Sequence, residues 1–344
     1  MAEAPSAVQQ YAGGKSEQFM VEVWITVGGV LRDLASQCVR QGFEALGVAA
    51  QGDGIWCVSD DGTPTGPALL WNDTRTADDL AGLIESGATA STGRGYHSAL
   101  WSGTSGMLWR WIRDAEPDRA ARTAHAITCA DWVGLCLTGQ LATDFSDASI
   151  PYLNFETRAY SEAQISDLEC DDIAPKLMVP QRSDSVLGLI TGQAAASTGL
   201  PKGLIDSVGT LALASMNVGL GMDHPGQTMM IMGTTAVVNI LTDHVTPSDT
   251  PVGASVLHPT SDVTIRALAP TTGAAAFDWF AGLHPKSLGG ASTGEVAARL
   301  NEFVMDVPVG SNGVTFLPYL NGERAPFAAP DFRGGFYVLS ATTS

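Results

Sequence analysis

The sequence predicts an α/β fold organised as two domains. Short, β-like apolar runs alternate along the chain with segments whose apolar residues recur at helical spacing. The 344 residues are enough to bury two cores. A composition of 45% hydrophobic and 16% charged residues is typical of a globular enzyme. We therefore expect a first and a second α/β segment joined by a less regular region.

The first segment follows a polar start. Residues 1–16 are small and polar, and we expect a disordered lead-in there. Apolar residues then recur at helical spacing from residue 17 to about residue 40, which predicts a helix. Strands are expected on both sides of a Gln-Gly-Asp-Gly turn at 51–54, because apolar runs flank it. The expected elements of this half are strands at 45–50, 55–58 and 68–71 and helices at 77–85, 106–113 and 128–137, the last ended by Gly139.

The second segment follows a region, residues 159–201, in which short helical patterns alternate with Pro and Gly breaks. Two apolar β-like runs are then joined by Gly233-Thr234-Thr235. The elements expected in this half are strands at 228–232, 236–241, 264–268 and 314–317 and helices at 273–281 and 294–303.

Composition excludes several classes of partner. The formal net charge of −18 argues against nucleic acid and against anionic membrane surfaces. The five cysteines show neither metal-site nor disulfide spacing, which favours a reducing cytoplasm. The start of the chain lacks a signal-peptide pattern, and no apolar run is long enough to span a membrane. A cytoplasmic protein with a small-molecule ligand is therefore expected.

Two short segments pair an aromatic side chain with a carboxylate. Asp53 follows an apolar run and precedes Trp56, and Trp71 stands two residues before Asp73. An indole face covers the C–H side of a sugar, and a carboxylate accepts hydrogen bonds from hydroxyl groups. Glycines beside Asp53 allow close approach of the backbone. These segments predict carbohydrate chemistry.

Three further runs of residues have alternative interpretations. The turn at 233–235 either binds a phosphate through backbone N–H groups and threonine hydroxyls or is an ordinary hairpin turn. Residues 270–275 either present a helix N-terminus to a nucleotide or form an ordinary capped helix. The run 316–326, which contains Glu323 and Arg324, is interpreted as a structural salt-bridge corner in preference to a catalytic pair. Residues 13–16 do not form a Walker loop, because the required first glycine is Gln9.

In combination, the motifs resemble the FGGY carbohydrate kinases, the sugar-kinase branch of the actin-like ATPase superfamily. The resemblance covers residues 17–340 and implies two actin-like (ribonuclease H-like) domains, at 17–204 and 205–344, with a cleft between them. The residues that carry it are Glu17-Gln18 before Trp24, Gln51 to Gly54, Trp71-Asn72-Asp73 with Arg75, Asp131-Trp132, Leu137-Thr138-Gly139, Thr143-Asp144 with Ser146 and Ala148, Gly219-Leu220-Gly221, Pro225-Gly226, Gly233-Thr234-Thr235, Pro318 to Pro326 and Arg333-Gly334.

The resemblance also implies an activity and a set of site residues. Family members transfer the γ-phosphoryl group of ATP, with Mg²⁺, to a sugar or polyol hydroxyl. The implied substrate is a ketopentose, a polyol or a sugar acid, as in L-xylulose, 3-keto-gulonate and erythritol kinases. The segment 93–101, which contains Tyr96 and His97, falls where the family has further sugar contacts. The implied sugar-pocket residues are Gln51, Asp53, Trp71 and Asp73, and the implied nucleotide-side residues are Gly233, Thr234, Thr235, Gly273 and Ala274.

Three departures from the family pattern bear on activity. Residues 1–16 hold no Asp-x-Gly-Thr phosphate loop, and the chain stops at Ser344 before the family's glycine-rich adenosine segment, so both domains are expected to be incomplete. The family's general-base aspartate precedes the Gly219-Leu220-Gly221 motif by seven residues, and Ala212 stands there. The nearest upstream carboxylate is Asp206. The protein is therefore expected to be an impaired kinase or, alternatively, a non-catalytic sugar-binding or regulatory pseudokinase. An open sheet edge left by absent strands would favour association, so a homodimer is considered.

Overall fold

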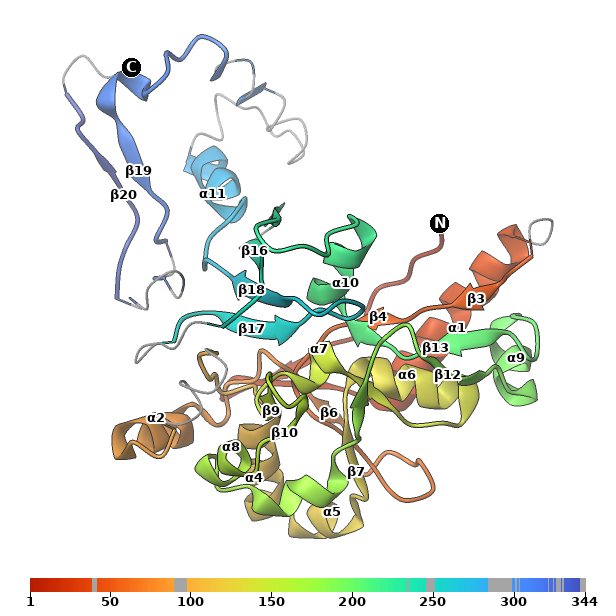
Figure 1. Cartoon of the computed structure of the whole chain (residues 1–344). Coiled ribbons are helices and arrows are strands. Elements are labelled where there is room, and N and C mark those ends of the chain that lie inside the picture. Colours follow the sequence, from red (N-terminus) through yellow and green to blue (C-terminus); the bar gives the residue numbers. More distant parts are fainter. Residues whose placement is uncertain are drawn as a thin grey trace. The chain divides into compact units, whose positions relative to one another are not determined.

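The computed structural model divides the chain into two compact units, each made of two stretches of sequence. The first unit contains Met1–Gln227 and Leu241–Ile265, and the second contains Thr228–Ile240 and Arg266–Ser344. Helices and strands occur in both, as expected for an α/β fold (Figure 1). The structure describes residues 1–38, 42–89, 98–233, 235–245, 251–283 and, within 299–340, all positions except 301, 303, 321, 324, 326–328 and 330.

A β-hairpin at residues 9–18 overlaps the expected disordered lead-in of residues 1–16 and corrects that expectation for residues 9–16. Strands β1 (Gln9–Tyr11) and β2 (Lys15–Gln18) pair antiparallel, with Gln9 opposite Glu17. Gly13 and Gly14 close the turn with φ of 78° and 72°, a conformation that favours glycine. Strand β2 also pairs with β6 (Ala68–Leu69), so the polar residues of the hairpin are held by a partner strand distant in sequence.

Helix α1 (Met20–Gln37) packs with α6 (Cys129–Thr138) and α9 (Gly192–Thr198) over one core of the first unit. Helix α6 begins with a capping box between Thr128 and Asp131 and ends at Gly139, whose φ of 73° is left-handed. The expected helix at 128–137 is therefore confirmed. The buried core residues shared by these helices are Ala35, Val133, Leu137, Ile190, Ala194, Leu200 and Leu204.

Residues 205–211 belong to the first unit because they form short parallel strand pairs with residues 45–50. Strand β13 (Ile205–Ser207) lies between β12 (Val186–Leu189) and β3 (Ala45–Leu46), and β14 (Thr210–Leu211) pairs parallel with β4 (Ala49–Ala50). The expected domain boundary between residues 204 and 205 does not coincide with the compact units, because β13 and β14 hydrogen-bond to strands near the start of the chain. The expected strand at 45–50 is divided into β3 and β4.

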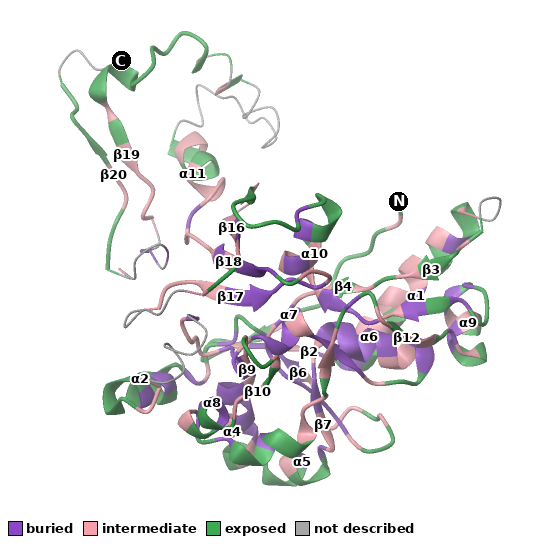
Figure 2. Cartoon of the chain, in the orientation of Figure 1, coloured by how far each residue is buried: buried purple, intermediate pink, exposed green. Residues whose placement is uncertain are grey.

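A second core lies under α4 (Ser105–Ala115). Its buried residues include Ile55, Leu69, Met107, Leu108, Trp109 and Ile112 (Figure 2). Strand β5 (Trp56–Val58) pairs antiparallel with β7 (His125–Ile127) at this core. The other elements of this unit are α2 (Ala77–Ser86), α5 (Pro117–Arg122), β8 (Thr143–Asp144), α7 (Phe145–Ala148), β9 (Leu153–Asn154), β10 (Ala159–Tyr160), α8 (Glu162–Asp167), η1 (Asp171–Lys176), β11 (Pro180–Gln181), α10 (Ala212–Gly219) and β17 (Ala254–Leu257).

The second unit contains a small cluster of aromatic rings, in which Trp279 and Phe336 are each 39% exposed. The Phe316 ring lies 4.7 Å from the Phe336 ring, measured between centroids, and stacks on the Trp279 ring at 5.9 Å. These rings come from β19 (Thr315–Leu317), β20 (Gly335–Tyr337) and α11 (Ala275–Leu283). Strands β15 (Thr228–Met232) and β16 (Ala236–Thr242) form an antiparallel pair, η2 covers Ser311–Gly313, and β18 (Thr264–Leu268) spans the division between the units.

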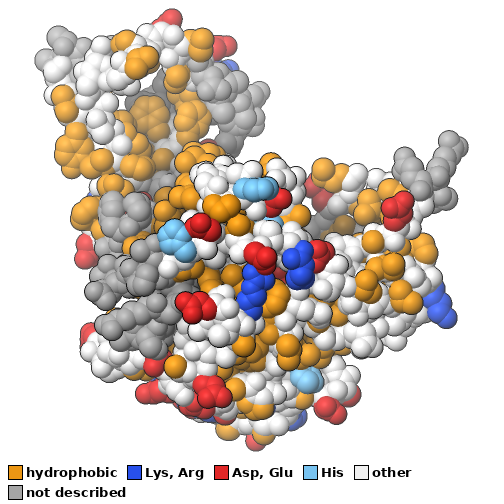
Figure 3. Space-filling view, viewed as in Figure 1, with side chains coloured by type: hydrophobic (Ala, Val, Ile, Leu, Met, Phe, Trp, Pro, Cys, Tyr) orange, Lys and Arg blue, Asp and Glu red, His pale blue; other side chains and the backbone are white. Residues whose placement is uncertain are grey.

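No helix of the described residues is long and apolar enough to cross a membrane. On the face shown in Figure 3, acidic side chains lie scattered among hydrophobic and uncharged ones, in keeping with the net charge of −18.

Candidate functional site

The candidate site lies where the parallel strands β4 and β14 end. Leu211 pairs with Ala50, so the next residues along each strand, Ala212 and Gln51, leave the same edge. Loops at the carboxyl ends of parallel strands commonly form binding sites. A Cβ atom on Gly52 would lie 2.0 Å from Leu211 Cδ1 and 3.0 Å from Asp147 Oδ1, so a side chain here would require the Leu211 side chain to move. The structure therefore brings the Gln51–Asp53 segment and the Ala212 position together.

Asp53 is the predicted sugar-binding residue whose geometry fits that role. Its backbone has a φ of 57°, which is uncommon for a non-glycine residue and turns the side chain out of the strand direction. The residue is half-buried, while its Oδ1 atom is buried and has no hydrogen-bond partner. Burial raises the pKa of Asp53 well above its usual value. Its carboxyl group is thus an acceptor available to a ligand.

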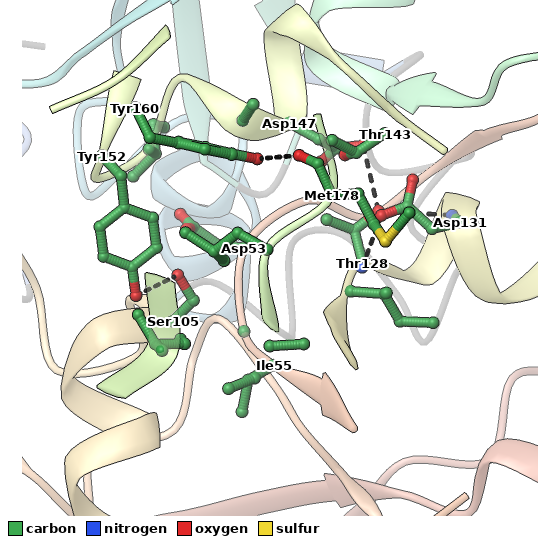
Figure 4. Close-up of a pocket in the computed structure, with 17 residues that line it drawn as sticks. Asp53, Ile55, Ser105, Thr128, Asp131, Thr143, Asp147, Tyr152, Tyr160 and Met178 are labelled. Atoms are coloured by element: carbon green, nitrogen blue, oxygen red, sulfur yellow. Dashed lines mark hydrogen bonds between the residues drawn. The ribbon is translucent and has the colours of Figure 1, made fainter. Parts of the chain in front are cut away.

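Asp53 borders a small cavity inside the first unit (Figure 4). The cavity has a volume of about 40 Å³ and is also lined by Asp131, Asp147, Tyr152 and Tyr160. Burial raises the pKa of Asp131 to about 7. Burial also raises the pKa of Asp147, to which the charges of Asp144, Asp131 and Asp53 add. The cavity wall is therefore rich in carboxyl groups that resist ionisation.

Asp144 fastens the strand that leads to Ala212. Its carboxylate accepts hydrogen bonds from Ser146 Oγ and from Thr210 Oγ1, each at 2.8 Å, and from the Asp147 N–H that it caps at the start of α7. Ser146 Oγ in turn accepts a hydrogen bond from the Leu211 N–H. Burial raises the pKa of Asp144 to about 6, although these hydrogen bonds act in the opposite direction. The family motif at Thr143-Asp144 and Ser146 thus positions the end of β14, a role that the sequence motif did not reveal.

Ala212 stands at the expected general-base position, and Asp206, the nearest carboxylate upstream, lies in different surroundings. Ala212 is the first residue of α10 and is half-buried, with a methyl group that cannot accept a proton. Asp206 lies in β13 with 0% exposure, and neither of its carboxyl oxygens has a hydrogen-bond partner. Burial raises its pKa to about 7. It is not among the residues that line the cavity.

The Trp71-Asn72-Asp73 motif does not reach this cavity. The Asp73 carboxylate is fully buried and accepts hydrogen bonds from the Ser16 N–H at 2.7 Å and from the backbone and guanidinium of Arg75. Arg75 also forms an ion pair with Glu17 at 2.6 Å. The Trp71 side chain is 42% exposed, and neither it nor Asp73 lines the cavity. Asp73 holds the β2 hairpin in place, so its carboxylate is already occupied.

Gln51 is tied to the start of the chain. Its Nε2 donates to Gln18 Oε1 at 2.5 Å, and Gln18 Nε2 donates to Ser6 Oγ at 2.7 Å. Of the segment 93–101, residues 93–97, which include Tyr96 and His97, lie outside the described residues.

Four of the five predicted nucleotide-side residues meet in the second unit. The Ala274 N–H donates to the Gly233 carbonyl at 2.7 Å, and the Gly233 N–H donates to the Thr235 carbonyl at 3.0 Å. A Cβ atom on Gly273 would lie 2.5 Å from both Ala236 N and Thr235 C, so only glycine fits. The backbone of the turn and the start of α11 are therefore in contact. The fifth residue, Thr234, lies outside the described residues.

The run at 316–326 supports this turn. Glu323 is buried, and its Oε1 accepts hydrogen bonds from the Thr271 N–H at 2.9 Å and from the Ala325 N–H at 3.3 Å. Arg324 lies outside the described residues. Among the residues that the structure describes, no group of three His, Cys, Asp or Glu side chains is placed to hold a metal ion.

Comparison with known proteins decides the family. The sequence model of the FGGY family of carbohydrate kinases, N-terminal domain, matches residues 1–216. The chain belongs to this family. The resemblance inferred from the motifs is thus confirmed, and so is the two-domain α/β fold class.

Curated relatives of this FGGY chain are sugar and polyol kinases. The erythritol kinase of Brucella abortus is 28% identical over 349 residues, covering 95% of this chain and 65% of its own length. The probable L-xylulose kinase of Pasteurella multocida is 25% identical over 316 residues, covering 91% of this chain and 63% of its own length. The FGGY chain therefore spans slightly less than two thirds of these relatives.

Solved structures share its fold. The xylulose kinase from Rhodospirillum rubrum superposes with a TM-score of 0.86 at 21% identity, covering 99% of this FGGY chain and 68% of that chain. The glycerol kinase from Plasmodium falciparum superposes with a TM-score of 0.84 at 16% identity, covering 99% and 68%.

Proposed function

We propose that this FGGY chain binds a sugar or polyol in its first unit and transfers the γ-phosphoryl group of ATP to one of its hydroxyl groups. The observation that carries the proposal is the shared strand edge at which Asp53 and Ala212 lie. Asp53 there offers a buried, unpartnered carboxyl oxygen to a hydroxyl donor. In the transfer, the hydroxyl oxygen forms a bond to the γ-phosphorus, the bond from that phosphorus to the β–γ bridging oxygen breaks to release ADP, and the hydroxyl proton passes to water, because Ala212 cannot accept it.

The nucleotide would be held by the turn of the second unit. Gly273 packs so closely on the 233–236 backbone that a side chain would not fit, so no side chain of residue 273 blocks the approach of a phosphate to the turn. Gly233, Thr235, Gly273 and Ala274 are the described residues that would approach ATP, and Thr234 completes the proposed set. Bound ATP supplies the phosphoryl group. We take it as its Mg²⁺ complex, because Mg²⁺ is usually bound through substrate phosphates and few carboxylates.

The proposal is tested by incubating the full chain with ATP, Mg²⁺ and a panel of ketopentoses, polyols and sugar acids. Mass spectrometry should detect a product heavier by one phosphoryl group in samples with the chain and not in its absence. Failure of a folded chain that binds both ATP and sugar to form any product would contradict the catalytic proposal.

The second candidate is a non-catalytic sugar-binding or regulatory protein. Ala212 favours it, because a methyl group at the general-base position removes the usual route for the hydroxyl proton. Phosphoryl transfer depends mainly on positioning and charge, so loss of the base alone is compatible with slow turnover.

An Ala212→Asp variant tests the placement of the general base at residue 212. In a chain that binds ATP, the new carboxylate should raise the rate of phosphoryl transfer by about 10²-fold or more, the usual range for a general base. No gain in a folded, ATP-binding variant would contradict the placement of the base at residue 212. Ala212→Asn is the matched control, because it adds similar volume without a proton acceptor of that strength.

A further inference from the structure

Two buried aspartates behind Asp53 have no assigned role in the proposed reaction. Asp131 is 2% exposed and Asp147 is 7% exposed, and both line the cavity shown in Figure 4. The Oδ1 atom of each has no hydrogen-bond partner, and the same is true of Asp53 Oδ1. A buried polar atom without a partner costs free energy, so three such atoms at one cavity indicate a ligand that donates hydrogen bonds.

The remaining polar groups of the wall are already engaged. Asp131 Oδ2 accepts from the Thr128 N–H at 2.9 Å, and Tyr160 donates its hydroxyl proton to the Met178 carbonyl at 2.8 Å. Ser105 Oγ donates to the Tyr152 hydroxyl at 3.3 Å. Asp53, Asp131 and Asp147 therefore each keep one carboxyl oxygen whose capacity to accept a hydrogen bond is unused.

The size of the cavity limits what can enter. Its volume is about 40 Å³. A water molecule needs roughly 10–15 Å³ on this scale, so the cavity has room for a few waters or for one hydroxymethyl group. Pockets that enclose a whole small molecule are usually about 300 Å³ or larger. Only one end of a substrate fits here.

The charged groups of the cavity wall determine which chemical group of a substrate can enter. No Lys, Arg or His is present among the described residues that line the cavity. A carboxylate entering this space would lie beside three carboxyl groups with no positive charge to compensate it. Burial of a charge that no opposite charge pairs is strongly unfavourable. A neutral hydroxyl, in contrast, can donate to a carboxyl oxygen.

We propose that Asp131 and Asp147 make the site selective for the neutral hydroxymethyl end of a polyol or ketose and against the carboxylate end of a sugar acid. This inference rests on the proposed function and narrows its substrate class. The hydroxyl donates to an aspartate oxygen, and the methylene group contacts apolar side chains of the wall such as Ile55 and Ile173.

Binding of a matched pair of compounds tests the inference. The probes are a pentitol and the aldonic acid of the same length and configuration, titrated calorimetrically into the full chain at pH 7.5. The wild-type chain should bind the pentitol at least about tenfold more tightly than the acid, since one unpaired buried charge easily exceeds that difference. Asp147→Asn should reduce this ratio by roughly fivefold or more, because it replaces a carboxyl group with an amide whose NH₂ group can donate to the carboxylate of the acid.

Asp206→Asn is the matched control. It also replaces a buried, unpartnered carboxyl group of the first unit, but one that does not line the cavity, so the ratio should stay at the wild-type value. The inference is overturned if the wild-type chain binds the acid as tightly as the pentitol. It is equally overturned if Asp147→Asn changes the ratio no more than Asp206→Asn does. If Asp147→Asn fails to fold, the ratio of the wild-type affinities for the pentitol and the acid decides whether the inference stands.

The outcomes separate this inference from the proposed function. If the folded chain binds representatives of neither compound class, the proposed function fails and the inference fails with it. If the chain binds the pentitol and the acid equally tightly, the inference alone is overturned and the proposed function stands.

Discussion

Buried carboxyl groups of the first unit serve different purposes according to their hydrogen bonds. Asp73 and Asp144 each accept several hydrogen bonds and hold distant segments together. Asp53 and Asp147 keep an oxygen atom free at a cavity, as a binding group should. The Asp206 carboxyl group makes no hydrogen bond and does not line that cavity, so its burial lowers stability with no compensating interaction.

Replacing Asp206 should therefore stabilise the chain. Its pKa rises from 3.8 to about 7 on folding, so the folded state holds the proton more tightly than the unfolded state between these values. Stability falls as the pH rises through that window, and the full cost is present above about pH 7. Asp206→Asn should raise the free energy of unfolding by roughly 1–3 kcal/mol at pH 7.5 and by little at pH 4. Urea denaturation at both pH values measures this, and an equal effect at the two values would contradict it.

Gly273 is the residue of the second unit least able to accept a side chain. A methyl group there would press on backbone atoms of Thr235 and Ala236, which cannot move aside cheaply. Gly273→Ala should lower the free energy of unfolding by about 1–3 kcal/mol and weaken ATP binding. Gly282→Ala is the control, because Gly282 lies in α11 with nothing within 4 Å of an added Cβ. Isothermal titration with ATP should show a loss for the first variant only.

At the level of elements, Asp144 joins α7, β8 and β14. Asp144→Ala would remove the cap of α7 and leave Ser146 and Thr210 without their shared acceptor. The expected loss is about 2–4 kcal/mol in the free energy of unfolding, together with weaker sugar binding because β14 loosens. Asp184→Ala, which removes an exposed carboxylate paired with Arg182, should change stability by less than about 0.5 kcal/mol. Similar losses for both variants in thermal denaturation would show that the Asp144 network contributes little.

The longer elements could be predicted from the sequence because their signals are local. Helices α2, α4, α6 and α11 lie within two residues of the expected ranges, since helical periodicity and the Thr128 and Gly139 caps act over a few residues. Strand β1 was missed because Gln9–Tyr11 carries no apolar pattern and depends on its partner strand. The expected helix at 294–303 falls largely outside the described residues.

The site was predictable only in part, for a related reason. Asp53 could be recognised from its own segment, because the glycines and aromatic residue beside it are neighbours in sequence. The cavity lined by Asp131 and Asp147 could not be predicted, because its walls come from segments distant in sequence. The first and last lining residues, Asp53 and Met178, are 125 positions apart. Asp73 was assigned to the sugar pocket, but its carboxylate is engaged by Ser16, which is 57 residues away.

At the scale of the whole molecule, the two ligands should protect different parts of the chain. Polyol binding should slow hydrogen exchange of cavity segments such as 126–131 and 143–148, and an ATP analogue should slow that of 228–240 and 270–283. With each ligand at 100 times its dissociation constant, amides that exchange through unfolding of that unit should slow by about 100-fold. Protection of the cavity strands by nucleotide, with 228–240 unchanged, would contradict the assignment of the nucleotide site.

The way the first unit is assembled from two stretches also bears on how the protein is made. Its second stretch, Leu241–Ile265, includes β17, where the Leu257 N–H donates to Ser149 Oγ and the Ser255 N–H donates to Ser98 Oγ. During synthesis, the ribosome must therefore deliver β15 and most of β16, which belong to the second unit, before the first can close. Until then, the hydroxyl groups of Ser98 and Ser149 lack the N–H donors of β17. A chain released near residue 227 would lack β17, the strand that completes the first unit.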